Sequence, residues 1–188
     1  AHHAELDLIV LSSPHMNELW VIDHSTTTAQ AAGSSGGRWE RGGDLLWRWG
    51  NPRNYGRGSD ANRRLFYQHD PTWIDGPNGE LRLLVYNNGG ERPAGEYSTV
   101  EELVLPFSRE AGFTREPEAA FGPEAPAWTF GGPSVFYSPF ISGAQRLPNG
   151  NTFICVGAPG RLLEVSGSGE ILWEYFNEHA GRSVPKSP

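Results

Sequence analysis

The sequence predicts an all-β protein, a β-propeller built from four-stranded antiparallel blades. Three observations favour this fold. The chain carries 24 Gly and 15 Pro among its 188 residues, no window is long or periodic enough to predict a substantial helix, and segments far apart in the chain repeat one another. Short apolar runs alternate with turn signals throughout, which is the pattern of strands joined by tight connections.

The clearest unit lies near the C-terminus, in residues 143–175. Its four strands are expected within 143–151, 152–156, 160–165 and 169–175, and Pro-Asn-Gly, Ala-Pro-Gly and Gly-Ser-Gly separate them. These residues supply the turn geometry that joins neighbouring antiparallel strands. The segment is therefore predicted to form a four-stranded meander, which is one blade of a propeller.

Two alignments without gaps extend this unit to the rest of the chain. Residues 43–51 align with residues 169–177, and the two segments are identical at the Gly, the second Leu, the Trp and the Asn. Residues 78–85 align with residues 149–156. The first alignment predicts a recurring outer strand, and the second predicts a recurring second strand together with its entry turn.

The repeats divide the chain into three units and a tail. The first blade, residues 1–50, lacks its innermost strand, and its strands are expected at 6–11, 18–22 and 45–49. The second blade, residues 65–130, has a long insertion over 106–126, and its strands are expected at 68–74, 81–86, 100–105 and 127–130. The third blade covers residues 138–177, and residues 178–188 form a tail without strand character.

Three blades are too few to close a ring, because propellers close with about four to eight. The chain is therefore expected to be about half of a larger ring, which the same protein or a second chain completes. Trp residues recur in the predicted strands, where their side chains fill the space between blades, as at Trp20, Trp47, Trp73, Trp128 and Trp173. The alternative is a self-contained β-sandwich, which the length allows.

Charge and cysteine content exclude several classes of function. The formal net charge is -7 and no basic stripe is present, so nucleic acids and anionic membrane surfaces are disfavoured as partners. The single Cys155 lies in a predicted strand, which leaves no disulfide framework and no Cys-rich metal site. No metal and no cofactor are expected. Neither a signal peptide nor a membrane-spanning segment is visible, so membrane insertion is not expected.

Antiparallel geometry groups several polar residues at one end of the second unit. The start of the innermost strand and the end of the next strand lie on the same face, which places Gln68, His69 and Asp70 beside Asn87 and Asn88. An imidazole titrates near ~6.5, so His69 can serve as base, acid or nucleophile at neutral pH. His69 is therefore the candidate catalytic residue. The structural alternative is that His69 and Asp70 tie adjacent blades together by hydrogen bonds.

Other cationic and titratable side chains offer weaker candidates. Arg146 and Arg161 could present cations to an anionic ligand or pair with carboxylates at the blade edges. His24 is expected on the face opposite His69, in a turn whose hydroxyls and carboxylate cap the backbone. His15 and His179 lie in a turn and in the tail, where no catalytic role is expected.

Several of these segments resemble the bacterial arylsulfotransferase family and its relatives. The resemblance rests on Gln-His-Asp-Pro-Thr-Trp-Ile at 68–74, Leu-Leu-Val-Tyr-Asn-Asn-Gly at 83–89, Ser-Gly-Ala-Gln-Arg-Leu-Pro-Asn-Gly-Asn-Thr at 142–152, Gly-Glu-Ile-Leu-Trp-Glu-Tyr at 169–175 and Glu-Leu-Trp-Val-Ile-Asp-His-Ser-Thr-Thr at 18–27. It covers most of the chain up to residue 177. It is more specific for the fold than for the activity.

The resemblance implies a six-bladed ring, exported to the periplasm or the cell exterior, of which this chain is the C-terminal half. A channel histidine in such proteins takes the sulfuryl group from an aryl sulfate and passes it to a phenol, without a nucleotide donor. Residue by residue, it implies that His69 is the nucleophile or acid and that Asn87 and Asn88 bind the transferred group. Gln68, Asp70 and Arg146 complete the set of candidate substrate-binding residues. The partners it implies are a small aryl sulfate or phenol and the remaining blades.

A second hypothesis comes from a different class of function. A non-catalytic propeller could bind a ligand or a protein, or help to build an assembly, through the loops that insertions 28–41, 51–64 and 106–126 would form on its faces. A quinone-cofactor dehydrogenase is disfavoured, because no carboxylate cluster or paired cysteine accompanies the Gly-x-x-Leu-Trp strands.

Overall fold

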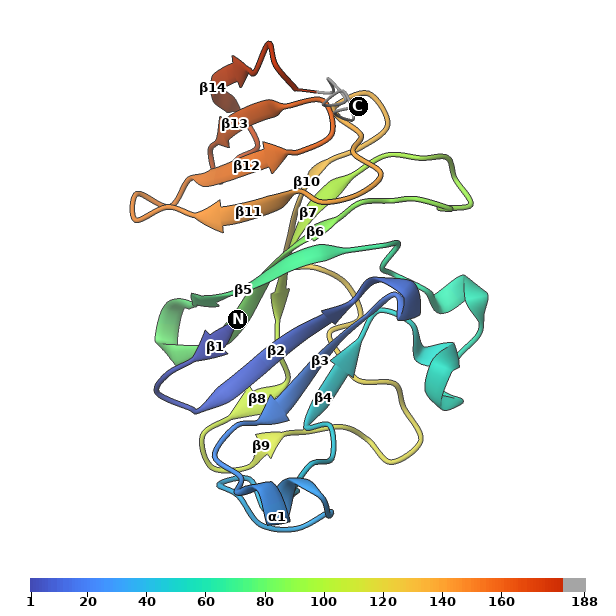
Figure 1. Cartoon of the computed structure of the whole chain (residues 1–188), viewed down its shortest axis with the longest axis vertical. Helices are drawn as coiled ribbons and strands as arrows, with labels where there is room; N and C mark the ends of the chain where they lie inside the picture. The colour runs from blue at the N-terminus through green and yellow to red at the C-terminus, as the bar shows by residue number, and fades with distance from the viewer. Residues whose placement is uncertain (181–188) are drawn as a thin grey trace, which may run out of the picture.

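A computed structural model, which describes residues 1–180, shows an all-β chain whose strands form three four-stranded antiparallel sheets and one two-stranded sheet. The first sheet contains β1 (His2–His3), β2 (Leu8–Ser13), β3 (Glu18–Asp23) and β4 (Trp47–Trp49). The second contains β5 (His69–Asp75), β6 (Leu81–Asn87), β7 (Thr99–Val104) and β10 (Trp128–Gly131). The third contains β11 (Gly143–Arg146), β12 (Thr152–Val156), β13 (Arg161–Val165) and β14 (Ile171–Phe176). The three sheets follow one another along the long axis of the molecule (Figure 1).

Helical structure is confined to short turns. The α-helix α1 (Thr28–Ala31) and the 3-10 turns Pro14–Met16, Pro52–Tyr55, Asp60–Asn62 and Pro77–Gly79 lie between strands. The long insertion of the second unit carries the two-stranded sheet, β8 (Phe107–Ser108) and β9 (Gly112–Phe113). The predicted all-β class, built from antiparallel sheets, is therefore confirmed. Of the predicted tail, only residues 178–180 fall within the described part of the chain.

The first sheet differs from the prediction at its inner edge. We expected no strand ahead of residue 6, whereas His2–His3 forms a short strand that pairs with β2. The amino group of Ala1 lies 2.9 Å from the carbonyl of Val10, and the Val10 amide donates to the Ala1 carbonyl at 2.9 Å. Two residues are too few to show the alternation that predicts a strand from sequence. This strand is defined only by its long-range hydrogen bonds.

The two Pro-Asn-Gly segments form the turns before β6 and before β12. Before β6 the Glu80 amide donates to the Pro77 carbonyl at 3.3 Å. Gly79 and Gly150 adopt φ values of 76° and 87°, which side chains other than glycine rarely tolerate. In the third sheet the turn closes with a hydrogen bond from the Gly150 amide to the Leu147 carbonyl. The repeated turn thus has a backbone reason, since each glycine lets one strand reverse directly into the next.

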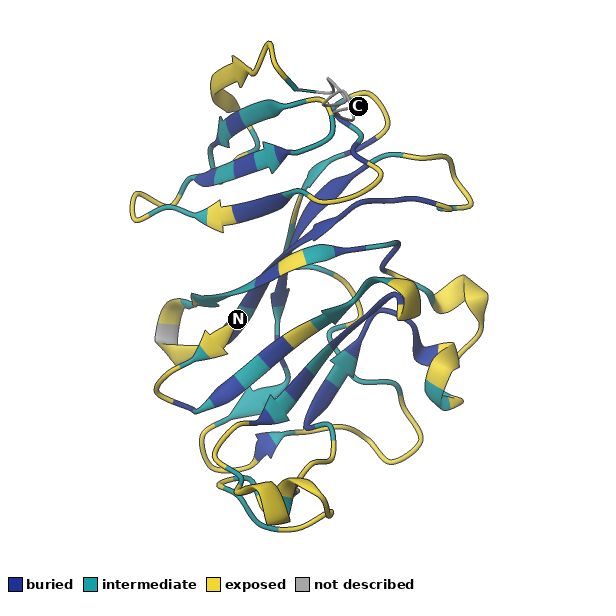
Figure 2. Cartoon of the chain, viewed as in Figure 1, coloured by how far each residue is buried: buried dark blue, intermediate teal, exposed yellow. Residues whose placement is uncertain are grey.

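The second sheet is buried on both faces, which explains the nearly continuous apolar run in β6. Leu83 and Val85 pack with side chains of the first sheet, whereas Leu84 and Tyr86 pack with side chains of the third. Successive residues of a strand point to opposite faces, so a strand between two sheets must be apolar at its odd and its even positions alike. The two resulting cores hold the three sheets face to face, with the buried residues at the centre of the stack (Figure 2).

The outward faces of the first and third sheets retain apolar side chains. In the third sheet, Trp173 and Tyr175 are 46% and 51% exposed, and their rings stack in a row with that of Phe153. In the first sheet, Leu11 is 42% exposed and pairs across the ladder with Trp20. Exposed apolar side chains of this kind are available to pack against another element.

Tyr86 provides a test of the core between the second and third sheets. Its side chain is fully buried and stacks on Phe136, and burial raises the pKa of Tyr86 to about 12. In the unfolded chain this phenol ionises near pH ~10. Above that pH the unfolded chain has therefore lost a proton that the folded chain retains. Stability should therefore fall by about 2 to 3 kcal/mol between roughly pH 10 and 12. Urea unfolding across this range measures the loss.

The Tyr86→Phe variant is the matched control for this pH dependence. It keeps the ring that packs against Phe136 and removes the ionisable hydroxyl, so its stability should fall less steeply in the same range. Equal pH profiles for the two proteins would contradict the assignment of this titration to Tyr86.

Candidate functional site

The backbone around His69 departs from regular strand geometry. Tyr67 and Asp70 adopt positive φ values of 58° and 53°, and a register shift interrupts the pairing of β5 with β6 between His69 and Thr72. Non-glycine residues in this region of φ are costly, and they gather at functional sites where the surroundings enforce them. Bulges likewise occur beside active sites, where they redirect a side chain. The segment that carries His69 therefore has two features of a built site.

The imidazole of His69 is held by one ring nitrogen. Its Nδ1 lies 2.8 Å from Asn88 Oδ1 and 3.0 Å from the Tyr67 carbonyl oxygen. Asn88 Nδ2 donates to the carbonyls of Ser138 and Ile141 at 2.9 and 2.8 Å, which fixes the orientation of the amide. Both partners of Nδ1 are thus acceptors, and Nδ1 must carry the proton.

The other ring nitrogen of His69 is left available. Within residues 1–180, no hydrogen bond joins Nε2 to another residue, and the side chain is half-buried. With Nδ1 protonated, a neutral imidazole presents the Nε2 lone pair as an acceptor, a base or a nucleophile. Asn88 is therefore a positioning residue for His69, and its own amide has no free donor left for a ligand.

Gln68 links the first and second sheets. Its side chain is fully buried, and its Nε2 donates to the Glu18 carbonyl at 2.8 Å and to Ser12 Oγ at 3.1 Å. Ser12 Oγ in turn donates to the Gln68 carbonyl at 3.0 Å. These bonds engage the amide nitrogen of Gln68 and make it a structural residue of the site, whereas its buried Oε1 has no hydrogen-bond partner among residues 1–180.

Asn87 anchors the segment that leads into β5. Its Oδ1 accepts from the Phe66 amide at 2.9 Å, and its Nδ2 donates to the Arg64 carbonyl and to Glu101 Oε1, both at 2.9 Å. Burial raises the pKa of Glu101, and the hydrogen bonds from Asn87 and Thr99 oppose that rise. The amide of Asn87 is thus fully engaged within the fold.

Asp70 and Arg146 mark two positions along the contact between β5 and β11. A Cβ atom on Gly143 would lie 2.1 Å from Asp70 Oδ2, so only glycine leaves room there for the carboxylate. Arg146 lies three residues further along β11, which is about 10 Å in a strand. Its guanidinium pairs with Glu102 and lies over the Trp128 ring at 5.1 Å. Arg146 is therefore held by partners away from Asp70.

A cavity of about 610 Å³ opens between β5 and the third sheet. Asp70, Ser142 and Arg146 contribute polar groups to its lining, and Trp73 and Phe153 contribute aromatic rings. This volume and this mixture of apolar walls with a few polar groups suit a small organic ligand. His69 directly precedes Asp70, and its partner Asn88 binds the carbonyl of Ile141, another lining residue.

Cys155 also lines this cavity, yet it is a poor nucleophile. Burial, and in second place the charge of Asp70, raise the pKa of the Cys155 thiol. The thiolate is the reactive form, so a raised pKa leaves this residue protonated and unreactive at neutral pH. Cys155 is therefore a weaker candidate nucleophile than His69, which precedes the lining residue Asp70 in the chain.

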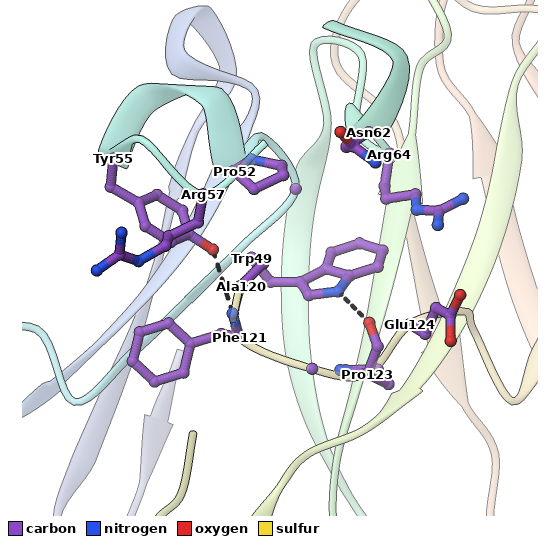
Figure 3. A pocket seen from close by; sticks show the side chains of 12 residues that line it. Trp49, Pro52, Tyr55, Arg57, Asn62, Arg64, Ala120, Phe121, Pro123 and Glu124 are labelled. Carbon is purple, nitrogen blue, oxygen red and sulfur yellow. Dashed lines mark hydrogen bonds between the residues drawn. The ribbon is translucent and has the colours of Figure 1, made fainter. Parts of the chain in front are cut away.

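A smaller cavity of about 240 Å³ lies where two insertions meet (Figure 3). Tyr55 and Arg57 come from the insertion that follows β4, and Phe121 comes from the one that follows β7. The indole of Trp49 donates to the Pro123 carbonyl at 2.7 Å, which fastens the second insertion to β4. The sequence predicted both insertions as loops, but it could not predict that their aromatic side chains face one another.

The structure thus brings Gln68, His69, Asp70, Asn87 and Asn88 to the same end of the second sheet, as antiparallel geometry predicted. Arg146 lies apart from them, on β11. The backbone acceptors that fix Asn88 went unpredicted, because carbonyl groups carry no signal in a sequence. His24 follows β3, at the opposite end of the sheets from His69 (Figure 1), which agrees with its predicted location.

Comparisons with known proteins give little further guidance. No family model matches the chain, and no curated protein matches it. A solved structure, a protein of unknown function from Bacteroides caccae, shares 13% sequence identity with a TM-score of 0.36. That similarity covers 90% of this chain but only 57% of the other. Within residues 1–180, no helix has the length and apolar character needed to cross a membrane.

Proposed function

We propose that this chain is part of a β-propeller that transfers a sulfuryl group from an aryl sulfate to a phenol through His69. The observation that carries the proposal is the hydrogen bonding of the His69 imidazole. Its Nδ1 is held between two oxygen acceptors while Nε2 has no hydrogen bond to a described residue. The sequence resemblance to arylsulfotransferases names the substrate, and the geometry of His69 supplies a nucleophile suited to it.

The propeller part of the proposal rests on how the sheets pack. Three meanders follow one another in chain order, and the middle one is covered on both faces. The stacked rings of Trp173 and Tyr175 on the third sheet and the pair of Leu11 and Trp20 on the first would be buried if further sheets continued the stack. Further blades, from the same protein or from a second chain, are therefore the partners that we propose.

The chemistry has two steps. In the first, the Nε2 lone pair attacks the sulfur of the aryl sulfate, the N–S bond forms, and the bond from sulfur to the aryl oxygen breaks. The departing phenolate takes a proton from water. In the second, the acceptor phenol gives its proton to the hydroxide left by the first step, its phenolate attacks the same sulfur, the N–S bond breaks, and neutral His69 returns. Sulfuryl transfer between phenols needs no further reactant.

His69 needs stabilisation while it carries the sulfuryl group, because the imidazole ring is then positively charged. The Nδ1–H donates to Asn88 Oδ1 and to the Tyr67 carbonyl, and hydrogen bonds from a charged donor are stronger than neutral ones. These acceptors therefore favour the intermediate. Asn87 and Asn88 position His69 rather than bind the sulfuryl oxygens, since the fold already engages their amides. Groups on further blades must supply that binding.

The aryl ring has a suitable place in the larger cavity, which is lined by Asp70, the residue after His69. The cavity that starts at Asp70 has aromatic walls at Trp73 and Phe153, and stacking on such side chains would hold a phenyl group. Export from the cytoplasm, which the resemblance implies, forms part of the same proposal.

An assay of the full-length protein with 4-nitrophenyl sulfate tests this function. With a phenol acceptor present, nitrophenol should be released continuously. Without the acceptor, release should slow after an amount stoichiometric with the protein, because the sulfuryl group stays on His69. No release under either condition would contradict the proposal, as would a steady rate that is independent of the acceptor.

A second function, ligand recognition without catalysis, is supported by the cavity in Figure 3. Its aromatic residues Tyr55 and Phe121 and the cation of Arg57 come from two separate insertions, which is how loops build recognition sites on a rigid scaffold. Ligand binding that Tyr55→Ala abolishes, in a protein that turns over no aryl sulfate, would favour this function.

A further inference from the structure

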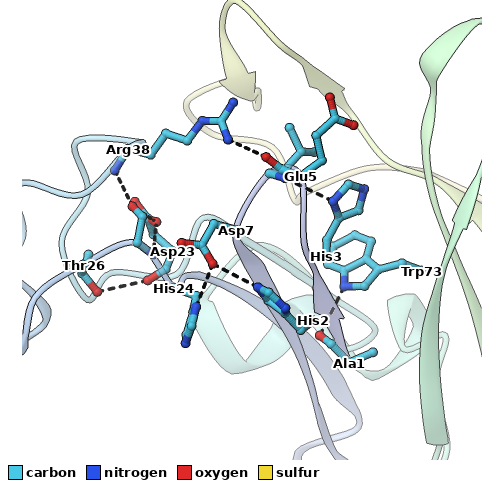
Figure 4. A network of polar contacts seen from close by, with 12 residues as sticks. Ala1, His2, His3, Glu5, Asp7, Asp23, His24, Thr26, Arg38 and Trp73 are labelled. Atoms are coloured by element: carbon cyan, nitrogen blue, oxygen red, sulfur yellow. Dashed lines mark hydrogen bonds and ion pairs between the residues drawn. The ribbon is translucent and has the colours of Figure 1, made fainter.

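A cluster of two histidines and one aspartate lies at the end of the first sheet opposite His69 (Figure 4). His2 comes from β1, Asp7 from the turn between β1 and β2, and His24 from the residue after β3. His2 Nε2 lies 3.0 Å from Asp7 Oδ1, and His24 Nδ1 lies 2.7 Å from the same oxygen. The three potential ligand atoms all lie within 4.8 Å of one another.

The backbone fixes all three residues before any ligand arrives. The His24 amide donates to the Asp7 carbonyl at 2.9 Å, and β1 holds His2 opposite Ile9 of β2. Asp7 itself has a positive φ of 52°, a conformation that the surrounding hydrogen bonds must maintain. Between His2 and Asp7, the Leu6 amide donates to His3 Nδ1 at 3.3 Å and so orders the connecting turn.

The side chains of the cluster are accessible and correctly charged for a cation. His2 and His24 are exposed and Asp7 is half-buried, so water can complete a coordination shell. An aspartate carboxylate is ionised at neutral pH, so Asp7 supplies the negative charge that a cation requires. The neighbouring Asp23 is not available as a ligand, because the Ser25 and Trp39 amides already bind its two oxygens.

We propose that His2, Asp7 and His24 form a binding site for a divalent transition-metal ion, with Zn²⁺ as the preferred ion. Two imidazole nitrogens and one carboxylate oxygen form a ligand set that Zn²⁺ accepts, with water in the remaining position. Ca²⁺ and Mg²⁺ prefer shells made of oxygen and are disfavoured. The ion would replace the shared protons that now join both imidazoles to Asp7 Oδ1.

The site would fasten the short strand β1 to the end of β3. This matters because β1 contains only two residues, and its neighbourhood contacts the second sheet. Trp73 Nε1 donates to the Ala1 carbonyl at 3.2 Å, and the His3 ring packs edge-on against Trp73 at 5.5 Å. Metal binding would thus stabilise the inner edge of the first sheet against Trp73, a residue that lines the larger cavity.

Calorimetric titration of the untagged, metal-free protein with ZnCl₂ tests the site. One Zn²⁺ ion should bind per chain, and thermal unfolding should shift to higher temperature as Zn²⁺ is added. His24→Ala should weaken Zn²⁺ binding about tenfold or more, because it removes one of three ligands. His15→Ala, which removes a histidine outside the cluster, should bind like the parent. Equimolar MgCl₂ or CaCl₂ should not compete.

Co²⁺ gives a readout that does not depend on the stability of one variant. Co²⁺ bound by the two imidazoles should give visible absorption bands that Asp7→Asn and His24→Gln each alter, whereas His15→Ala leaves them unchanged. Circular dichroism confirms that each variant is folded. Zn²⁺ binding of equal strength in the parent and in His24→Ala would overturn the proposal, as would the absence of Zn²⁺ binding by the parent. Neither result bears on sulfuryl transfer, because the cluster lies at the opposite end of the sheets from His69.

Discussion

Replacement of His69 by alanine should reduce sulfuryl transfer from 4-nitrophenyl sulfate to a phenol by a factor of about 10³ or more. The reason is chemical, since the variant has no nitrogen to accept the sulfuryl group and the direct reaction between donor and acceptor must occur unaided. The loss should appear in kcat, because the cavity that begins at Asp70 is unchanged. Steady-state kinetics of the full-length variant measure it.

The fold should survive this substitution. His69 is half-buried, and its removal takes away one hydrogen bond to Asn88 and one to the Tyr67 carbonyl, which should cost about 1 to 2 kcal/mol. His179→Ala is the matched control, because His179 is exposed and follows β14. Added imidazole should restore part of the lost activity. Turnover by the His69→Ala variant at the rate of the parent would eliminate His69 as the nucleophile.

Replacement of Trp47 by alanine should destabilise the protein by about 3 to 5 kcal/mol. Trp47 is fully buried in the core between the first and second sheets, and its Nε1 donates to the Gly122 carbonyl at 2.8 Å. The variant loses the packing of a large aromatic ring and also the bond that ties the long insertion to β4. Denaturant unfolding at neutral pH measures the change in the free energy of unfolding.

Trp47→Phe separates these two contributions. It retains an aromatic ring in the core and removes the donor to Gly122, so its cost should be about 1 to 2 kcal/mol. A cost for Trp47→Ala no larger than that for Trp47→Phe would show that the face-to-face contact between the sheets is weaker than the structure indicates.

The sequence predicts the sheets well for a physical reason. Turn residues and apolar runs are local signals, so the Pro-Asn-Gly turns that precede β6 and β12 indicate the strands beside them. The gapless alignments add the outer strands β4 and β14. The strand β1 escapes prediction because its two residues have no pattern of their own. The hydrogen bonds between Ala1 and Val10 define it instead.

The candidate site, like the fold, was predicted only in part. Antiparallel pairing alone predicts that His69 lies near Asn87 and Asn88, because the start of one strand lies beside the end of the next. It does not predict what the amides do, since an amide can bind a ligand or a backbone group equally well. The structure shows that Asn87 holds the Phe66 segment and that Asn88 orients the imidazole.

The sequence does not predict the proposed metal site either, for another reason. His2, Asp7 and His24 have no spacing that matches a known ligand motif, and the turn with its positive φ at Asp7 determines where the carboxylate lies. The sequence does not reveal the larger cavity either, because two separate sheets must pack before it exists.

The most direct test of sulfuryl transfer through His69 is the mass of the peptide that contains this residue. The full-length protein is first incubated with an aryl sulfate in the absence of an acceptor. We predict that this peptide gains the mass of one SO₃ group, that fragmentation places the group on His69, and that a phenol added before the digestion removes it. An unmodified His69 peptide in a protein that releases phenol, or a sulfuryl group on another residue, would contradict the account.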